Sequence, residues 1–188
     1  MPPSAYERRK DPQKVRAALI EATTTMIAAH GLAGVTVDAV AKAAGVTKGG
    51  LFHHFHSKQA LIDGVHDLIV ADAEARFAAL IADDPEPHGC FTRALLNSVF
   101  NPHQIGDAAP ARTLCLAMLA DPALQRRWAA WTEQQVARHA ATDDNVPCAI
   151  VRLAADGVWL SSLHDADTPP PVSQAVRDAL CAMTYPDG

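Results

Sequence analysis

The side chains best suited to chemistry in this chain are hydroxyls and lysines near helix starts in the first 58 residues. Every lysine of the 188-residue sequence lies in this segment. Thr36, Thr47 and Ser57 each precede an apolar helical pattern, and Lys48 and Lys58 directly follow two of them. Free backbone N–H groups and the helix dipole make a helix N-terminus favourable for an anion. Lys48 at the start of a short helix is therefore a residue that the phosphates of a nucleic acid would select.

Charge is unevenly distributed along the chain. Residues 1–58 carry eight basic and four acidic side chains, whereas the remaining 130 residues carry eight arginines and 17 acidic side chains. The first segment thus has a net charge of +4 and the rest −9, within a total of −5. A basic module joined to an acidic body is typical of a protein that meets a polyanion at one end only. Chance clustering on a solvated surface remains the alternative.

Metal and redox chemistry have little support in the sequence. His53, His54 and His56 lie close together, but no two are four residues apart, as a pair of ligands on one helix face requires. Partial protonation of these histidines would instead add to phosphate affinity. The four cysteines are 25 to 33 residues apart without a CxxC pair, which favours neither a disulfide framework nor a zinc module. We therefore expect no metal and no cofactor.

Patterns typical of enzymes and membrane proteins are also missing. The sequence contains no P-loop, GxGxxG or HExxH motif and no Ser-His-Asp order. Charges interrupt every apolar stretch before the roughly 18 residues of a membrane span, and no signal peptide is visible. We expect a cytoplasmic protein that is not an enzyme and has no membrane partner.

Helix caps and stops divide the first sixty residues into four expected helices. Asp11-Pro12 starts the first, because aspartate caps a helix and proline fits its first turn. Gly31 ends the first helix and Gly45 the second, since glycine adopts the left-handed conformation that closes a helix. The third helix is short, at about 48–54, and the fourth extends to about residue 82. The caps expected for these three later helices are Thr36, Thr47 and Ser57.

Two short helices joined by a tight turn at Gly45, with a longer helix before them, are the pattern of a helix-turn-helix unit. In such a unit the second short helix enters the major groove, and a lysine at its N-terminal end suits DNA phosphates. Helix-turn-helix geometry also occurs in proteins that never bind DNA. The geometry alone therefore leaves a protein-binding role open.

The stretch 34–61, GVTVDAVAKAAGVTKGGLFHHFHSKQAL, resembles the TetR family of bacterial repressors. The caps, the turn glycine, the apolar spacing and the Leu-aromatic-x-x-Phe-x-x-Lys ending agree, and the resemblance covers about residues 12–65. It implies a homodimer in which each subunit places its third helix in the major groove of a palindromic operator. It also implies phosphate contacts by Thr36 and Lys58. The residues that it places on or beside the groove are Thr47, Lys48, Gly49, Gly50, His53 and His54.

Three positions of the third helix are unusual. Phe52 is a predicted DNA contact where tyrosine is frequent in the family and its hydroxyl reaches a phosphate, so only the packing of the ring remains. Gly49 and Gly50 each cost a helix roughly 0.5–1 kcal/mol. They allow the backbone to approach DNA closely or to contact a thymine methyl group, and they leave few side chains to read bases.

The remainder of the chain shows apolar helical stretches separated by proline, aspartate and asparagine, without strand-like alternation. The predicted fold class is all-α, with about nine helices. A helix-turn-helix DNA-binding domain over 1–56 precedes a helical ligand-binding and dimerisation domain over 57–188, and the helix 57–82 connects the two. The five later helices are expected at about 88–100, 111–120, 122–141, 147–164 and 172–184.

The helices at 147–164 and 172–184 are the predicted dimer interface. The first is apolar around most of its circumference and carries small residues that let another helix approach closely. A two-fold dimer needs a self-complementary apolar face, and the family resemblance points the same way. The alternative is that both helices belong to the core of one subunit.

The acidic body is also the expected effector site, because apolar walls with a few polar groups are typical of ligand pockets. Two alternatives remain. Aromatic residues at helical spacing are often ordinary core, and an arginine and an aspartate four residues apart can form an ion pair without a ligand. The candidate ligand-binding residues are Phe91, Met118, Trp128, Trp131, Arg152, Asp156 and Trp159.

The sequence as a whole predicts a ligand-responsive DNA-binding transcriptional regulator. In this prediction a repressor binds a palindromic operator as a dimer and is released by a small-molecule effector. The alternative is a helical protein-interaction adaptor without DNA binding. Salt distinguishes the two, because phosphate contacts release counterions whereas an apolar protein interface does not.

Overall fold

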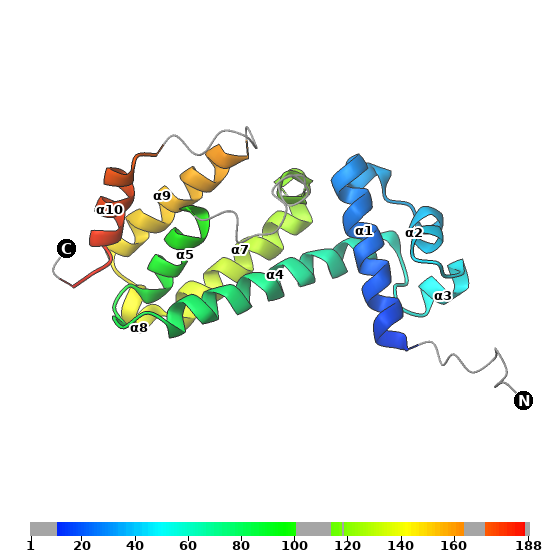
Figure 1. The fold of residues 1–188 in the computed structure, drawn as a ribbon, viewed down its shortest axis with the longest axis horizontal. Coiled ribbons are helices and arrows are strands. Elements are labelled where there is room, and N and C mark those ends of the chain that lie inside the picture. The colour runs from blue at the N-terminus through cyan, green and yellow to red at the C-terminus, as the bar shows by residue number, and fades with distance from the viewer. Residues whose placement is uncertain (1–10, 101–113, 118, 164–171, 187–188) are drawn as a thin grey trace, which may run out of the picture. The chain divides into compact units, whose positions relative to one another are not determined.

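The computed structural model describes residues 11–100, 114–117, 119–163 and 172–186, and every regular element in these ranges is an α-helix (Figure 1). The predicted all-α class is confirmed. The chain divides into two compact units, residues 1–68 and 69–188, and the division falls inside helix α4, Lys58–Ala82. The boundary predicted from the sequence precedes this helix, at 56/57. None of the described helices is long and apolar enough to cross a lipid bilayer.

Unit 1 contains α1, Pro12–Gly34, α2, Val37–Ala43, α3, Lys48–Phe52, and the start of α4. All four helices begin at the predicted caps. Each capping side chain accepts a hydrogen bond from a backbone N–H that the helix itself leaves without a partner. The donors are the N–H groups of Gln13 to Asp11 at 3.1 Å, Ala39 to Thr36 at 3.2 Å, Gly50 to Thr47 at 3.0 Å and Ala60 to Ser57 at 3.0 Å.

Both predicted helix stops are confirmed in unit 1. Gly31 has a φ of 66° and interrupts α1, after which one further turn leads to Gly34. Gly45 has a φ of 67° in the connection between α2 and α3. α3 ends at Phe52, two residues earlier than predicted, because the His54 N–H donates to the carbonyl three residues back and tightens the last turn.

The core of unit 1 draws on all of its helices and holds α3 in place. Gly64 lets α4 approach α1 closely, since a Cβ at this position would lie 2.6 Å from Ile20 Cδ1. A helix of five residues has no stability of its own, so α3 depends on this packing. The buried apolar side chains include Leu19, Ile20, Ile27, Val35, Val40, Leu51, Phe55 and Leu61.

Unit 2 contains the rest of α4 and five further helices with defined bounds. Residues 114–117 and 119–120 are also helical, in agreement with the predicted helix 111–120 as far as it is described. The helices expected at 88–100, 147–164 and 172–184 are present within the described residues. The bounds are α5, Cys90–Phe100, α7, Pro122–Arg138, α8, Ala140–Asp143, α9, Val146–Ser162, and α10, Gln174–Ala182.

The prediction of one continuous helix over 122–141 is wrong. The chain leaves helical geometry at His139, with φ −104° and ψ 18°, and this residue separates α7 from α8. The break is stabilised from outside the helix. The Asp143 carboxylate accepts a hydrogen bond from the Thr92 N–H in the first turn of α5 at 2.7 Å, and the Gly89 N–H donates to the Thr142 carbonyl at 3.0 Å.

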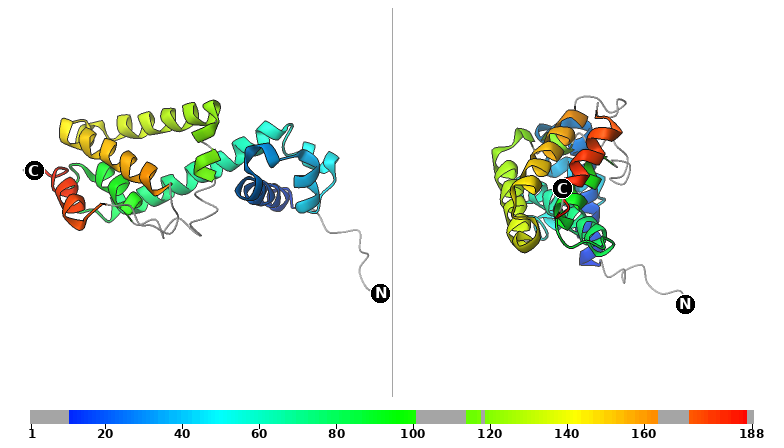
Figure 2. Two further views of the ribbon diagram at one scale, coloured as in Figure 1. Left: turned by 90° about the horizontal axis from the view of Figure 1, so that it is seen from above. Right: turned by 90° about the vertical axis from the view of Figure 1, so that its left-hand side faces the viewer.

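Two apolar clusters form the core of unit 2, and α5 contributes to both. Figures 1 and 2 show α9 and α10 beside α5. The cluster between α4, α5 and α7 contains Ala73, Phe77, Phe91, Ala94 and Trp131. The cluster between α5 and α9, against which α10 packs, contains Leu96, Val99, Val151, Ala155 and Val158.

Arg93 ties the end of the described chain to the connection between α4 and α5. Its buried guanidinium donates to the Asp84 carboxylate at 2.7 Å and to the carbonyl oxygens of Glu86, His88 and Thr184. Burial alone would raise the pKa of the Asp84 carboxyl, but the hydrogen bonds and the charge of Arg93 outweigh it and lower that pKa. The network thus satisfies a charge that would be costly to bury alone.

Candidate DNA interface and effector site

Helix α3 has one buried and one exposed side. Leu51 is fully buried and anchors the helix in unit 1, whereas four predicted DNA contacts on α3 or directly after it are exposed. Phe52 is the large apolar member of this set, with 44% of its surface exposed. A ring exposed to this extent does not belong to the core of unit 1. The four exposed residues are Lys48, Gly49, Phe52 and His53.

Lys48 forms an ion pair that the sequence analysis did not predict. Its Nζ lies 3.0 Å from Oδ1 and 3.2 Å from Oδ2 of Asp38, in the first turn of α2. Both side chains are exposed, so the pair contributes little to stability. A phosphate could therefore compete with Asp38 for the Lys48 ammonium group. Without such a competitor, Asp38 holds this group at the start of α3.

The predicted phosphate contacts Thr36 and Lys58 remain able to donate, and so does Thr47, which is predicted to lie on or beside the groove. Thr36 and Thr47 accept backbone N–H groups as caps, and a hydroxyl that accepts in this way keeps its own hydrogen for a phosphate. Lys58 Nζ lies 3.5 Å from the Ala33 carbonyl oxygen, a long hydrogen bond that leaves further N–H groups available.

The two glycines of α3 differ in their surroundings. A Cβ on Gly49 would meet no atom within 4 Å, whereas a Cβ on Gly50 would lie 3.2 Å from Thr47 Oγ1. Gly49 is therefore the position where α3 offers bare backbone to a partner. His54 is half-buried, so His53 is the more accessible of the two histidines.

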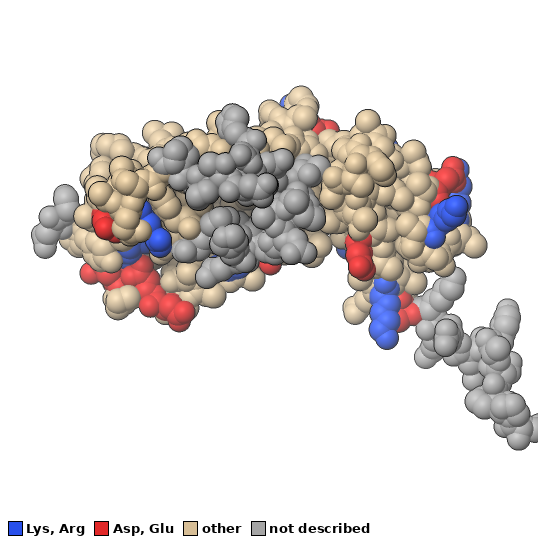
Figure 3. All heavy atoms as spheres, turned by 45° about the horizontal axis from the view of Figure 1, so that its top comes forward, with Lys and Arg blue, Asp and Glu red and all other residues tan. Residues whose placement is uncertain are grey.

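The described part of unit 1 is not a uniformly basic surface. Figure 3 shows basic and acidic side chains next to each other on this unit, in keeping with the Lys48–Asp38 pair. Residues 11–68 contain five basic and five acidic side chains. Half of the +4 charge of residues 1–58 comes from residues 1–10, which lie outside the described residues, because Arg8, Arg9 and Lys10 outnumber Glu7 there.

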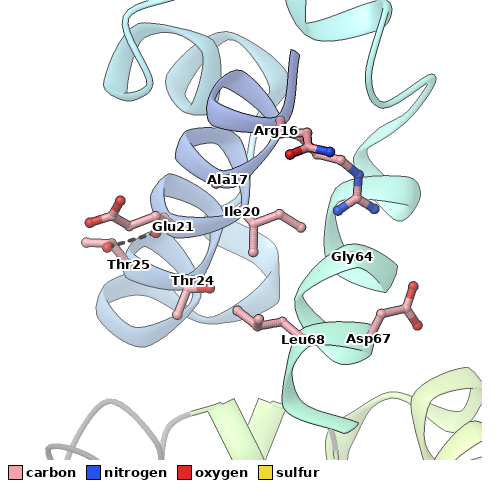
Figure 4. Close-up of a pocket in the computed structure, with 10 residues that line it drawn as sticks. Arg16, Ala17, Ile20, Glu21, Thr24, Thr25, Gly64, Asp67 and Leu68 are labelled. Carbon is pink, nitrogen blue, oxygen red and sulfur yellow. Dashed lines mark hydrogen bonds between the residues drawn. The ribbon is translucent and has the colours of Figure 1, made fainter. Parts of the chain in front are cut away.

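A pocket of about 640 Å³ opens between α1 and α4 of unit 1. Figure 4 shows Ile20 pointing toward α4 near Gly64, with Arg16 and Asp67 at the rim. Among the residues that the structure describes, none of those predicted to bind an effector lines this pocket. It is distinct from the aromatic cluster of unit 2.

In unit 2 the structure brings together three of the predicted ligand residues. Phe91 and Trp131 are buried in the cluster between α4, α5 and α7, and Trp128 packs against it. The rings of Trp128 and Trp131 have centroids 4.7 Å apart. Trp159 packs against the other cluster, between α5 and α9. The aromatic candidates therefore do not form a single site.

The polar candidate ligand residues also lie in different surroundings. Arg152 donates to Thr92 Oγ1 and to the Asp143 carbonyl oxygen, both at 3.0 Å, so its guanidinium bridges α5 and α8. Asp156 is exposed on α9. The ion pair weighed as an alternative for these two residues is thus not how Arg152 is held. Met118 lies outside the described residues.

Sequence reasoning missed two residues at the aromatic cluster. Phe77 of α4 stacks on Trp131 with centroids 5.8 Å apart. Glu74, one turn earlier, accepts hydrogen bonds from Trp131 Nε1 at 3.0 Å and from Gln135 Nε2 at 3.2 Å. A carboxylate hydrogen-bonded to one ring of an aromatic cluster suits a cationic group. The only sequence signal was the spacing of Glu74 and Phe77 on one helix, which is also typical of an ordinary amphipathic helix.

Comparisons with known proteins agree with this architecture. Residues 19–65 match the family model described as bacterial regulatory proteins, tetR family. Residues 89–185 match the model described as tetracyclin repressor-like, C-terminal domain, which covers half of the chain. The two models fall in unit 1 and unit 2 respectively.

Individual regulators and a solved structure are also similar to this chain. The regulator TtgR of Pseudomonas putida is 38% identical over 97 residues, which are 50% of this chain but only 44% of TtgR. The regulator BetI of Pseudomonas aeruginosa is 32% identical over 169 residues, 81% of this chain and 83% of BetI. The solved structure of the multidrug binding protein EbrR complexed with imidazole is 26% identical, with a TM-score of 0.64 over 98% of both chains. On these grounds the chain belongs to the TetR family of bacterial transcriptional regulators.

Proposed function

We propose that this chain is a ligand-responsive DNA-binding transcriptional regulator, and that it acts as a repressor. The observation that carries the proposal is the exposed side of α3. A five-residue helix is held by a fully buried Leu51 and presents Lys48, bare backbone at Gly49, and the Phe52 ring to solvent. This is the geometry by which a helix-turn-helix protein inserts one short helix into the major groove.

A second copy of the chain is the proposed partner of α9 and α10. Val146 and Leu153 of α9 are each 73% exposed, and Ile150, Leu160 and the α10 residue Val176 are close to half exposed. The four α9 residues are separated by four, three and seven positions, and these spacings place them on one side of the helix. A second copy would cover this apolar side and make a two-fold interface.

A two-fold dimer determines what DNA it reads. Two identical recognition helices related by a two-fold axis fit a palindromic operator whose half-sites lie one helical turn of DNA apart. Thr36, Thr47 and Lys58 would bind phosphates and fix the register. Lys48, Gly49, Phe52 and His53 would face the bases.

The proposed effector site is the aromatic cluster of unit 2, lined by Phe91, Trp128 and Trp131 with Phe77 and Glu74. EbrR, a related structure, is described as a multidrug binding protein. A ligand that binds among these rings would favour the conformation it fits. It can release the operator only by as much as its affinity differs between the two conformations.

The test is selection of bound duplexes from a random DNA library by the purified chain, followed by affinity measurements at several salt concentrations. We expect a palindromic consensus whose affinity falls steeply with salt. Lys48→Ala should weaken binding by about 10-fold, because it removes one charged contact worth roughly 1–3 kcal/mol.

Lys14→Ala is the matched control, since Lys14 is an exposed lysine of the same unit that is not part of the proposed interface. It should change affinity by less than about twofold. If no sequence is enriched, or if binding does not respond to salt, the chain is a protein-interaction adaptor and not a DNA-binding regulator.

A further inference from the structure

Three potential metal ligands meet in unit 2 at the break between α7 and α8. They are Cys90 at the start of α5, His139 at the break itself and Asp143 at the end of α8. Their ligand atoms all lie within 4.8 Å of one another. Neither the proposed DNA interface nor the proposed effector cluster uses these three side chains.

Asp143 is held in place as a ligand would be. The residue is fully buried. Its Oδ1 accepts a hydrogen bond from the Thr92 N–H at 2.7 Å, and its Oδ2 accepts one from the Thr142 hydroxyl, also at 2.7 Å. Each oxygen keeps a second lone pair for a cation. Hydrogen bonds of this kind orient the carboxylates that bind metals in proteins.

His139 and Cys90 are positioned by the neighbouring packing. The His139 ring stacks on Phe91 with centroids 5.1 Å apart and an angle of 3° between the planes, which fixes the orientation of the imidazole. Cys90 is buried, whereas His139 is half-buried, so the cluster can be reached from solvent on the histidine side.

We propose that Cys90, His139 and Asp143 bind one divalent transition-metal ion, and that water occupies the fourth position. One thiolate, one imidazole and one carboxylate are the ligand types that zinc accepts in tetrahedral sites. With metal–ligand bonds of about 2.0–2.3 Å, tetrahedral ligand atoms lie roughly 3.5 Å apart. The three ligand atoms therefore need to move together by about 1 Å when an ion binds.

The site was hidden in the sequence because its ligands come from two distant segments. His139 and Asp143 are four residues apart, but they share no continuous helix, since α7 ends at the histidine. Cys90 joins them because two bonds tie the start of α5 to α8: the Thr92 N–H donates to Asp143, and the Gly89 N–H donates to the Thr142 carbonyl. A bound ion would thus link α5, α7 and α8, the three helices that meet there.

Cobalt titration of the full chain, treated first with a chelator, tests the proposal directly. Cobalt is a spectroscopic substitute for zinc. We expect saturation at one equivalent, visible bands of a four-coordinate ion and near-ultraviolet absorption from a thiolate bound to cobalt. One equivalent of zinc should displace these signals.

Two variants and one control decide which residues are responsible. Cys90→Ser should abolish the thiolate absorption, and His139→Gln should lower cobalt affinity by about 10-fold or more. Cys148→Ser is the matched control, because Cys148 is also a buried thiol but lies on α9 outside the cluster. It should bind cobalt as the unchanged chain does.

Some results would overturn the proposal. One is the lack of thiolate absorption at one equivalent, and another is a signal that persists in Cys90→Ser and disappears in Cys148→Ser. Circular dichroism of each variant identifies any that does not fold. If Cys90→Ser fails this check, the affinity of His139→Gln decides the question by itself.

Discussion

At the scale of single residues, Phe52 offers the clearest test of the interface. Its ring is exposed on α3, so a hydroxyl added there would meet solvent and not the core. If the position faces a phosphate, Phe52→Tyr gains one hydrogen bond worth about 0.5–1.5 kcal/mol. Operator affinity measured by fluorescence anisotropy should then rise by about 2- to 10-fold.

Phe52→Leu is the control for this prediction, because it keeps an apolar side chain without adding a donor. It should bind no more tightly than the unchanged chain. An equal or lower affinity of Phe52→Tyr would mean that the ring does not approach the DNA backbone.

Gly89 and Gly49 should respond in opposite ways to alanine. Gly89 has a φ of 72°, and a Cβ there would overlap the Thr184 carbonyl oxygen. Gly89→Ala should therefore lower the free energy of unfolding by at least about 1–2 kcal/mol, the cost of left-handed backbone for a residue with a Cβ. Gly49→Ala adds a methyl group to open space on a helix and should raise it by about 0.5–1 kcal/mol.

Urea unfolding of both variants measures these changes. Gly49→Ala should also bind the operator more weakly, because its methyl group stands on the side of α3 proposed to face the bases. A Gly49→Ala variant with more stability and undiminished operator affinity would contradict close approach of the backbone at this position.

At the scale of helices, the break at His139 depends on a cap from a distant part of the sequence. Asp143→Ala removes the acceptor for the Thr92 N–H and leaves this buried donor without a partner. In the presence of a chelator, we expect the free energy of unfolding to fall by about 1–3 kcal/mol. Asp144→Ala, at the exposed neighbouring residue, should stay within about 0.5 kcal/mol. Equal effects in the two variants would show that the cap does not stabilise the break.

The number of residues between a capping side chain and the N–H group it accepts explains which elements are predictable from the sequence. Asp11, Thr36, Thr47 and Ser57 cap helices through bonds to residues two or three positions away, so local sequence determines these starts. Asp143 caps α5 across 51 residues, and no glycine or proline marks the break that brings it there. A prediction from local patterns therefore continues the helix through His139.

In the interface and the effector cluster, features within one helix are predictable from the sequence, whereas contacts between helices are not. The exposed side of α3 follows from its caps and its single buried leucine, both of which the sequence reveals. The pairing of Lys48 with Asp38 joins two helices around a turn, and the bonds from Trp131 and Gln135 to Glu74 join α7 to α4. Such contacts depend on how helices pack, which spacing within one helix does not encode.

At the scale of the whole molecule, the proposed function requires that effector and operator compete through the conformation of a dimer. A 100-fold loss of operator affinity requires about 2.8 kcal/mol of differential effector binding between two conformations. A dimer binds the operator more tightly than a single recognition helix does. The reason is that the second half-site binds as an intramolecular event once the first is occupied. A chain that cannot dimerise should thus lose operator affinity even with α3 intact.

Leu153→Glu tests this dependence. The side chain is 73% exposed in the single chain, so glutamate is tolerated there, but its charge would be buried without a partner in the proposed interface. Sedimentation should show a monomer at concentrations where the unchanged chain is a dimer, with the same circular dichroism and an operator affinity at least about 10-fold lower. Gln134→Glu adds the same charge to an exposed position of α7 and should remain a dimer. If Leu153→Glu is dimeric and binds the operator normally, the apolar side of α9 is not the surface through which two copies meet.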